Sequence, residues 1–332
     1  MIISRTPFRI SFFGGGTDYP AWYREHGGAV LATSINKYCY ISVRHLPPFF
    51  DYKSRILYSR IELVKSIDEI QHPSVRAALK FLKIDDGVEI HHDGDLPART
   101  GLGLSSTFTV GLLHALHALR SRMVTKMQLA REAIHIEHDV LSESVGAQDQ
   151  VITAHGGLNR IDFFPNDDFS LSPIILRRDR LVSFQNHCML VFTGFVRTAS
   201  EIAAEQIRRT PENKPSLTQM YQMVAAATDI LKGDGDIGDF GRLLHENWLL
   251  KRSLSSRVST SDIDSIYEAG RNAGALGGKV LGAGGGGFFL FFARPEEHAK
   301  IRAKLDRFLH VPFRFETLGS QIIHFDGFDQ AG

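Results

Sequence analysis

The segment from Pro97 to Thr107 constrains the fold of this chain more than any other stretch. It reads Pro-Ala-Arg-Thr-Gly-Leu-Gly-Leu-Ser-Ser-Thr, and apolar residues at helical spacing follow it from Phe108 onward. At the start of a helix, backbone N–H groups are unpaired and the helix dipole adds positive potential. The segment therefore predicts an anion-binding turn in front of a helix, with an ordinary loop and helix cap as the alternative.

The residue types in this segment suit a phosphate. Gly101 and Gly103 can adopt positive φ and let an anion approach the backbone closely. Ser105 and Ser106 stand where a hydroxyl can cap the helix or reach a phosphate-bound cation. Because no lysine follows the second glycine, the segment is not a Gly-x-x-x-x-Gly-Lys-Ser/Thr loop.

A second glycine cluster covers residues 281–287 and precedes the aromatic run 288–293. Gly282, Gly284 and Gly287 formally match the dinucleotide fingerprint, which requires a strand before it and a helix after it. Helical spacing over 263–273 comes before these glycines, and the aromatic run predicts a buried strand after them. This order argues against a dinucleotide fold and leaves a tight turn packed on a neighbouring element as the plain alternative.

A third cluster lies near the N-terminus, where residues 12–20 read Phe-Phe-Gly-Gly-Gly-Thr-Asp-Tyr-Pro. The residues before it alternate like a strand, so the glycines predict a bend with Asp18 just beyond it. Asp18 alone could make a simple Asx-turn. Three glycine clusters in one chain favour a common function over three independent turns.

Taken in order along the chain, these clusters resemble the three motifs of the GHMP kinases, the superfamily of galactokinase, homoserine kinase and mevalonate kinase. The resemblance spans nearly the whole chain and implies an ATP-dependent kinase of α+β fold. It implies an N-terminal lobe similar to the ribosomal S5 domain 2 and a ferredoxin-like C-terminal lobe. We expect the two lobes to cover residues 1–185 and 186–332.

By this resemblance the glycine-rich loops would hold ATP, bound with Mg²⁺. The expected ATP contacts are Pro97, Arg99, Gly101, Leu102, Gly103, Leu104, Ser105, Ser106, Thr107, Gly284 and Gly285. Leu104 occupies the position of the first serine of the family motif, which leaves Ser105 as the expected magnesium contact. A one-residue shift of the loop would give that role to Ser106.

Two carboxylates complete the expected catalytic site. Glu137 lies on a predicted helix, Asp149 follows twelve residues later, and the segment 142–146 between them breaks the helix. By resemblance, Glu137 would bind Mg²⁺ with Ser105, and Asp149 would orient or deprotonate the acceptor hydroxyl. Arg9 would stabilise the negative charge that develops during phosphoryl transfer.

The first motif indicates the acceptor. It matches the galactokinase form at Pro7, Arg9, Gly14, Thr17 and Asp18, whereas Gly15 and Gly16 replace an acidic residue and a histidine. This form resembles the D-glycero-D-manno-heptose 7-phosphate kinases, with fucokinases as near relatives. The expected substrate contacts are Gly15, Gly16, Thr17, Asp18, Arg197 and Gly286. Arg197 precedes two hydroxyls and a predicted helix start, a combination that suits the phosphate of the acceptor.

We therefore expect a kinase that phosphorylates the anomeric hydroxyl of D-glycero-D-manno-heptose 7-phosphate to give the 1,7-bisphosphate. One alternative is a 1-kinase for a free sugar such as fucose. The other is a catalytically silent sensor of sugar and ATP, which the combination of Asp149, Glu137 and Arg9 disfavours. A zinc deaminase is excluded because His135-Ile-Glu137-His138 has no Pro-Cys-x-x-Cys partner.

Composition fits a small-molecule enzyme. The net charge of +1 over 332 residues gives no field suited to nucleic acid, and two separated cysteines give neither a disulfide framework nor a zinc site. No apolar run is long enough for a membrane span. We expect a cytoplasmic protein that binds a sugar phosphate, as a monomer or a homodimer.

Periodicity predicts the elements in outline. Strands are expected at 2–13, 29–45, 54–64 and 87–92, with helices at 73–83, 105–121 and 126–141. Short strands at 157–163, 172–177 and 187–193 precede helices at 199–208, 216–231, 237–253 and 260–273. The end alternates again, with strands at 286–293, 313–317 and 320–325 around a helix at 296–309.

Overall fold

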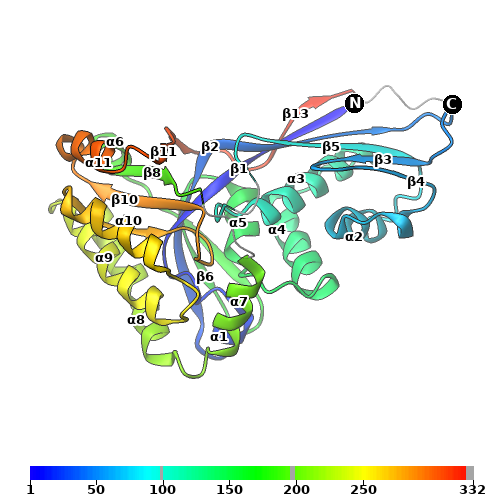
Figure 1. The fold of residues 1–332 in the computed structure, drawn as a ribbon. Coiled ribbons are helices and arrows are strands. Elements are labelled where there is room, and N and C mark those ends of the chain that lie inside the picture. The colour runs from blue at the N-terminus through cyan, green and yellow to red at the C-terminus, as the bar shows by residue number, and fades with distance from the viewer. Residues whose placement is uncertain (98–99, 195–198, 327–332) are drawn as a thin grey trace.

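The structure, a computed structural model, describes residues 1–97, 100–194 and 199–326. Its larger sheet has the strand order β13-β1-β2-β5-β3-β4. In addition, β6 and β12 pair with β2, and β7 pairs with β6. Two long antiparallel strands, β1 (Ile2–Phe13) and β2 (Gly28–His45), run along this sheet (Figure 1). The other strands are β3 (Ser54–Leu57), β4 (Ile61–Val64), β5 (Val88–Gly94), β6 (Leu158–Phe163), β7 (Phe169–Pro173), β12 (Phe315–Glu316) and β13 (Gln321–Phe325).

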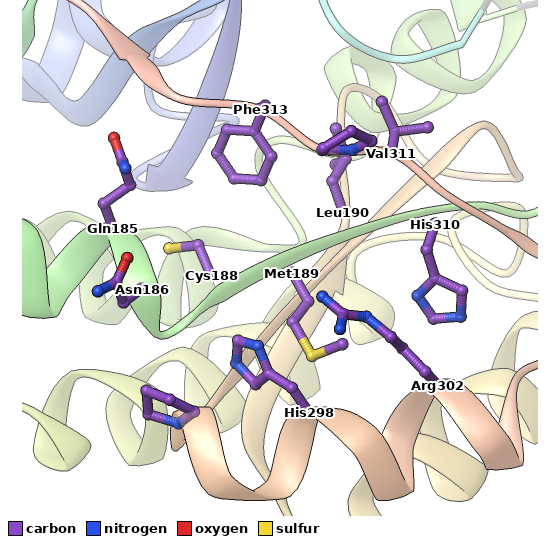
Figure 2. A pocket seen from close by; sticks show the side chains of 12 residues that line it. Gln185, Asn186, Cys188, Met189, Leu190, His298, Arg302, His310, Val311 and Phe313 are labelled. Atoms are coloured by element: carbon purple, nitrogen blue, oxygen red, sulfur yellow. The ribbon is translucent and has the colours of Figure 1, made fainter.

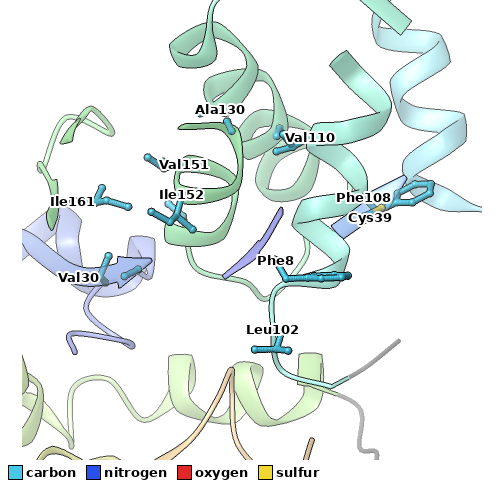
Figure 3. Packing of buried hydrophobic residues seen from close by; sticks show 14 of the residues in the cluster. Phe8, Val30, Cys39, Leu102, Phe108, Val110, Ala130, Val151, Ile152 and Ile161 are labelled. Atoms are coloured by element: carbon cyan, nitrogen blue, oxygen red, sulfur yellow. The ribbon is translucent and has the colours of Figure 1, made fainter. Parts of the chain in front are cut away.

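Helix α3 (Leu104–Leu119) packs on β1 and β2 and is buried along most of its length. Apolar side chains from α3, from α5 (Gln148–His155) and from the strands make the core of this lobe (Figure 3). Helices α2 (Pro73–Phe81) and α4 (Lys126–His135) pack against α3. Because the N-terminus of α3 is fixed by this core, the loop in front of it is held in place.

The smaller sheet has the order β11-β8-β10-β9, with β8 (Cys188–Phe192), β9 (Ala275–Val280), β10 (Phe288–Ala293) and β11 (Leu309–His310). Every residue of β10 is buried, as its aromatic run predicts. Helices α9 (Gly238–Ser253) and α10 (Ser261–Asn272) pack on β9, and α8 (Lys214–Lys232) packs on α9 and reaches β1 and β2. The remaining helices are α1 (Pro20–His26), α6 (Arg178–Asn186), α7 (Ala199–Arg208) and α11 (His298–Lys304).

Most predicted elements are confirmed, and the differences have local causes. The predicted strand 54–64 is the hairpin β3–β4, and the predicted helix 126–141 ends at His135 and continues as a π-helical turn, Ile136–Val140. The predicted helix 296–309 divides into a 3₁₀ turn, Pro295–Glu297, and the shorter α11. The sequence pattern missed α1, α5, α6, β9 and β11.

Strand β9 was missed because its glycines read as a loop. Those glycines serve close packing, since a Cβ on Gly277 would lie 2.0 Å from the carbonyl oxygen of Gly241 on α9. The turn 281–287 is therefore preceded and followed by strands, which still excludes the strand–turn–helix order of a dinucleotide fold.

The predicted boundary at 185–186 falls at the end of α6, two residues before β8, where the chain passes from the larger sheet to the smaller one. The end of the chain then returns, because β12 pairs with β2 and β13 with β1. A single cut therefore does not separate the two sheets, and the boundary stays a prediction.

Candidate active site

The glycine turn at 281–287 packs directly on the loop in front of α3, residues 100–103, which we call the phosphate loop after its predicted ligand. The backbone N–H of Phe288 donates to the carbonyl of Thr100 at 3.0 Å. A Cβ on Gly101 would lie 2.3 Å from the carbonyl oxygen of Leu281, and one on Gly282 would lie 2.7 Å from the Cα of Gly101. No side chain fits at either position, so these two glycines are required by the contact between the loops.

Arg9 and Asp149 join the first motif to this contact. Nε and Nη2 of Arg9 donate to the two carboxylate oxygens of Asp149 at 2.6 and 2.7 Å, and Nη1 donates to the carbonyl of Gly101 at 2.8 Å. Arg9 is buried, whereas the side chain of Asp149 keeps 20% of its surface exposed. The structure thus brings together the two predicted catalytic residues, and leaves the carboxylate open to a ligand.

The start of α3 has the features of an anion site. Gly103, at φ 79°, stands at the N-cap, and no side chain caps the helix there. Leu102 points into the core near Phe8 and anchors the loop (Figure 3). The N–H groups of the first turn are therefore free of side-chain acceptors within the described structure, as a phosphate would require.

The remaining predicted ATP contacts differ in their surroundings. Ser105 is exposed on the first turn, and Leu104 packs partly against the core. Thr107 is buried, and its hydroxyl donates to the carbonyl of Gly103 at 2.8 Å. The carbonyl of the exposed Pro97 accepts a bond from the Thr100 hydroxyl at 2.9 Å. Arg99 lies outside the described residues.

Glu137 lies fully buried in the π-helical turn after α4. Its Oε2 accepts a bond from the Ser106 hydroxyl at 2.7 Å and another from the amide of Gln150. Burial raises its pKa to about 7, although the bond from Ser106 opposes that shift. The structure brings Ser106 to this carboxylate, not the predicted Ser105, because Ser105 faces solvent one position earlier on the helix.

The first glycine cluster forms a tight bend around Asp18. The carboxylate of Asp18 accepts bonds from the Gly16 N–H at 2.9 Å and from the side-chain amide of Gln148 at 2.9 Å. It is 2% exposed, and burial, with a further contribution from Asp149, raises its pKa. Thr17 is also buried, and its hydroxyl donates to the carbonyls of Gly14 and Ala29 at 2.8 and 2.9 Å.

Three other predicted contacts belong to the second glycine turn. Gly284 packs on Val258, since a Cβ there would lie 2.7 Å from the Val258 carbonyl oxygen, and the N–H of Gly285 donates to the same carbonyl at 2.9 Å. Gly286 is buried with φ 148°. Arg197 lies outside the described residues.

Sequence reasoning missed Gln148, Gln150 and Lys251. The two glutamines flank Asp149 and hold the two buried carboxylates, Asp18 and Glu137. Their alternation around an aspartate at a helix start was a usable signal. Lys251 carried none, because it lies on α9 about a hundred residues along the chain from Asp149 and reads as an ordinary helical lysine.

The residues present fit a metal ion held jointly with phosphate. Within the described ranges, no group of three or more His, Cys, Asp or Glu side chains could hold an ion by itself. However, Oε1 of Glu137 and the side-chain oxygens of Gln148 and Gln150 are buried without partners. Mg²⁺ prefers such oxygen ligands and is commonly shared between one or two carboxylates and a substrate phosphate.

Two cavities lie apart from these residues. One, of about 480 Å³, is on the smaller sheet and is lined by Cys188, Met189, His298, Arg302 and His310 among others (Figure 2). The other is lined by residues of the 46–53 loop, with Lys65 and Gly87. Neither contains a predicted site residue. Among the described residues, no helix is long and apolar enough to cross a membrane.

The comparisons with known proteins agree with this geometry. The GHMP kinases N-terminal domain matches residues 72–157, and the GHMP kinases C-terminal domain matches residues 223–311. A D-glycero-alpha-D-manno-heptose 7-phosphate kinase from Campylobacter jejuni is 28% identical over 89% of this chain and 90% of its own length. An L-fucokinase/L-fucose-1-P guanylyltransferase from Bacteroides fragilis is 26% identical over 91% of this chain, but this covers only 36% of that longer protein.

Solved structures share the whole architecture. A D-glycero-D-manno-heptose 1-phosphate kinase from Bacteroides thetaiotaomicron superposes with a TM-score of 0.78 at 24% identity, over 98% of this chain and 99% of its own. A galactokinase from Lactococcus lactis superposes with a TM-score of 0.73 at 19% identity, over 96% of this chain and 94% of its own. These confirm the predicted two-lobed fold. With both family domains in sequence order, this chain belongs to the GHMP kinases and is a kinase.

Proposed function

We propose that this kinase transfers the γ-phosphate of ATP to the anomeric hydroxyl of D-glycero-D-manno-heptose 7-phosphate, giving the 1,7-bisphosphate. The observation that carries the choice of acceptor is the bend at Gly14–Asp18. A Cβ on Gly15 would make only ordinary contacts, at 3.8 Å with the side chains of Gln148 and Ser11, so the missing side chain leaves room beside Gln148. Space here suits an acceptor larger than a hexose. The similarity to a heptose 7-phosphate kinase along nearly the whole chain supports the same choice.

In this proposal Asp149 accepts a hydrogen bond from the acceptor hydroxyl or takes its proton, and Arg9 holds that carboxylate in place. Asp18 is nearly buried and holds the bend through Gly16 and Gln148, so its expected bonds to the sugar would come from the narrow exposed part of its carboxylate. Glu137 and Ser106 would hold Mg²⁺, which when bound supplies positive charge to the phosphates. Arg197 remains the proposed contact of the acceptor phosphate.

A fucokinase-like activity on a free sugar is the second candidate, because two bifunctional fucokinases match over more than nine-tenths of this chain. An acceptor panel separates the two. We would assay ATP-dependent phosphorylation of heptose 7-phosphate, free heptose, fucose, galactose and mannose, and locate the new phosphate by ³¹P NMR. Preference for heptose 7-phosphate, with a second phosphate at C1, supports the proposal. Equal activity on free heptose, or a product at another carbon, contradicts it.

A further inference from the structure

Lys251 lies near the end of α9, and its ammonium group is buried at the junction of the glycine segments. The residue is 4% exposed, and its Nζ donates to the carbonyl of Gly282. Gly282 packs on Gly101, whose carbonyl accepts the bond from Arg9. A chain of three contacts therefore connects Lys251 to the Arg9–Asp149 pair.

Two buried lysines lie within electrostatic range of the Arg9–Asp149 pair. Lys251 interacts electrostatically with Arg9, Asp18 and Asp149, and Lys279, which is 1% exposed, interacts with Lys251. Asp149 already pairs with Arg9, and Asp18 accepts hydrogen bonds from Gly16 and Gln148. Neither lysine has an ion-pair partner in the described part of the chain, and Lys279 donates to the carbonyl of Phe12 at 3.0 Å.

A buried, unpaired ammonium group costs several kcal/mol, and an anion bound nearby would offset that cost. A second observation on the same helix agrees. Asn247 stands one turn before Lys251, on the same helix face, and is fully buried. Both polar atoms of its side chain have no partner within the described residues, although buried amides are normally hydrogen-bonded. This face of α9 is built for a polar ligand.

We propose that Lys251 supplies positive charge to the phosphoryl group while it passes from the nucleotide to the acceptor. In that step the bond from the γ-phosphorus to the leaving oxygen breaks, a bond to the acceptor oxygen forms, and the hydroxyl proton passes to Asp149. Lys251 keeps its own protons, so its role is purely electrostatic. The inference rests on the kinase family and not on the identity of the acceptor.

The test compares Lys251→Met with Lys251→Arg. We expect Lys251→Met to lower kcat by about 10²-fold, the usual size for one electrostatic donor, with both KM values changed less than about threefold. Its melting temperature stays equal or rises, because an uncompensated buried charge is removed. Arg252→Met is the control, since it removes the neighbouring charge on the same helix, one that pairs with Asp264 at 3.3 Å. We expect the Arg252→Met variant to have the kcat of the unmodified enzyme.

The pH profile gives a second readout. Burial, with a further contribution from Arg9, lowers the pKa of Lys251 to about 8, although Asp18 and Asp149 oppose the shift. The ammonium form is therefore lost as pH rises through about 8, and kcat/KM should decline there. Lys251→Arg keeps its charge at this pH, so the decline should move to higher pH.

Three outcomes would overturn the inference. The first is normal turnover by Lys251→Met. The second is a lowered melting temperature of Lys251→Met, together with a Lys251→Arg variant that has the melting temperature and the pH profile of the unmodified enzyme. That result would make Lys251 a structural support for Gly282. The third is a rise in the KM of the acceptor alone. If heptose 7-phosphate is not the acceptor, the same measurements use the sugar that the panel identifies, so the two proposals fail separately.

Discussion

Arg9 and Asp149 are 140 residues apart in the chain, yet they make two parallel hydrogen bonds. Arg9 lies on β1, which the sequence pattern predicts, whereas Asp149 lies at the start of α5, a helix that the pattern missed. Their meeting could not be predicted from spacing, because it depends on how α3 and α5 pack on the sheet. The family resemblance paired them, and the geometry now gives that pair a physical basis: a bidentate guanidinium fixes the carboxylate in one orientation.

Replacing Asp149 with Asn should leave the fold intact and lower turnover by about 10²–10⁴-fold, the usual range for a lost general base. ATP affinity should change little, which calorimetric titration would show. Asp162→Asn is the matched control, because Asp162 also pairs with an arginine, Arg160, at 2.7 Å, but in the sheet. Near-normal turnover by Asp149→Asn would show that Asp149 is not the general base and that another group takes this role.

The two serines in the first turn of α3 should differ in their effect on metal. Ser106 donates to Glu137 at 2.7 Å, whereas Ser105 is exposed. We therefore expect Ser106→Ala to raise the Mg²⁺ concentration required for half-maximal activity more than Ser105→Ala does. The sequence alone favoured Ser105 by alignment with the family motif. A titration in which Ser105→Ala is the more affected variant would restore that first assignment.

Glu137 should make stability depend on pH. Burial raises its folded pKa from 4.5 to about 7, so its contribution to stability is fully present below about 4.5 and is lost as pH rises through about 7. Without metal, Glu137→Gln should therefore be more stable than the unmodified protein by about 2–3 kcal/mol at pH 8 and nearly equal to it at pH 4.5.

Urea unfolding at these two pH values measures that difference. Added Mg²⁺-ATP should stabilise the unmodified protein at pH 8 and the Gln variant much less, because a neutral amide is a weaker ligand. A difference between the two proteins that does not change with pH would show that Glu137 does not titrate in this range.

Some helices and strands can be predicted from a local sequence pattern, whereas others depend on tertiary packing. The start of α3, predicted at 105 and found at 104, follows from the glycines and the apolar spacing of one segment. By contrast, the π-helical turn at 136–140 was not predictable, because it turns Glu137 inward to partners from α3 and α5. Strand β9 was not predictable for the same kind of reason. Its glycines allow close packing against α9, which lies elsewhere in the chain.

The contact between the two glycine loops gives a prediction at this scale. Gly101 has φ 84°, and a Cβ there would lie 2.3 Å from the carbonyl oxygen of Leu281. Gly101→Ala should push the loops apart, destabilise the protein by about 1–3 kcal/mol and weaken ATP binding by about tenfold or more. Gly235→Ala is the control, because no atom lies within 4 Å of a Cβ at that exposed position.

Thermal unfolding and ATP titration of both variants test this prediction. If Gly101→Ala binds ATP as well as the Gly235 control does, the loop contact does not position the nucleotide. The phosphate site would then depend only on the N-terminus of α3.

For the molecule as a whole, the two sheets share one core. Phe12 from β1, Phe184 from α6, Phe240 from α9 and Phe292 from β10 form a cluster with ring-centre distances from 4.8 to 6.0 Å. Phe315 on β12 joins it next to Phe184, at 5.3 Å. The sequence predicted two lobes but gave no sign of this cluster, since its members come from five separate elements. The aromatic rings, and the return of β12 and β13, join the lobes.

We therefore expect the two lobes to unfold together. Phe240 is fully buried and contacts Phe12, Phe13, Phe184 and Phe292, so Phe240→Ala should leave a cavity and cost about 3–5 kcal/mol. We would follow the urea unfolding of Phe240→Ala by circular dichroism and by loss of activity. Both signals should shift to lower urea concentration as one transition, because both sheets lose the same packing. Phe49→Ala, at a residue 87% exposed, should change stability by less than about 0.5 kcal/mol. Two separate transitions in Phe240→Ala, one followed by circular dichroism and the other by activity, would show that the two lobes unfold independently.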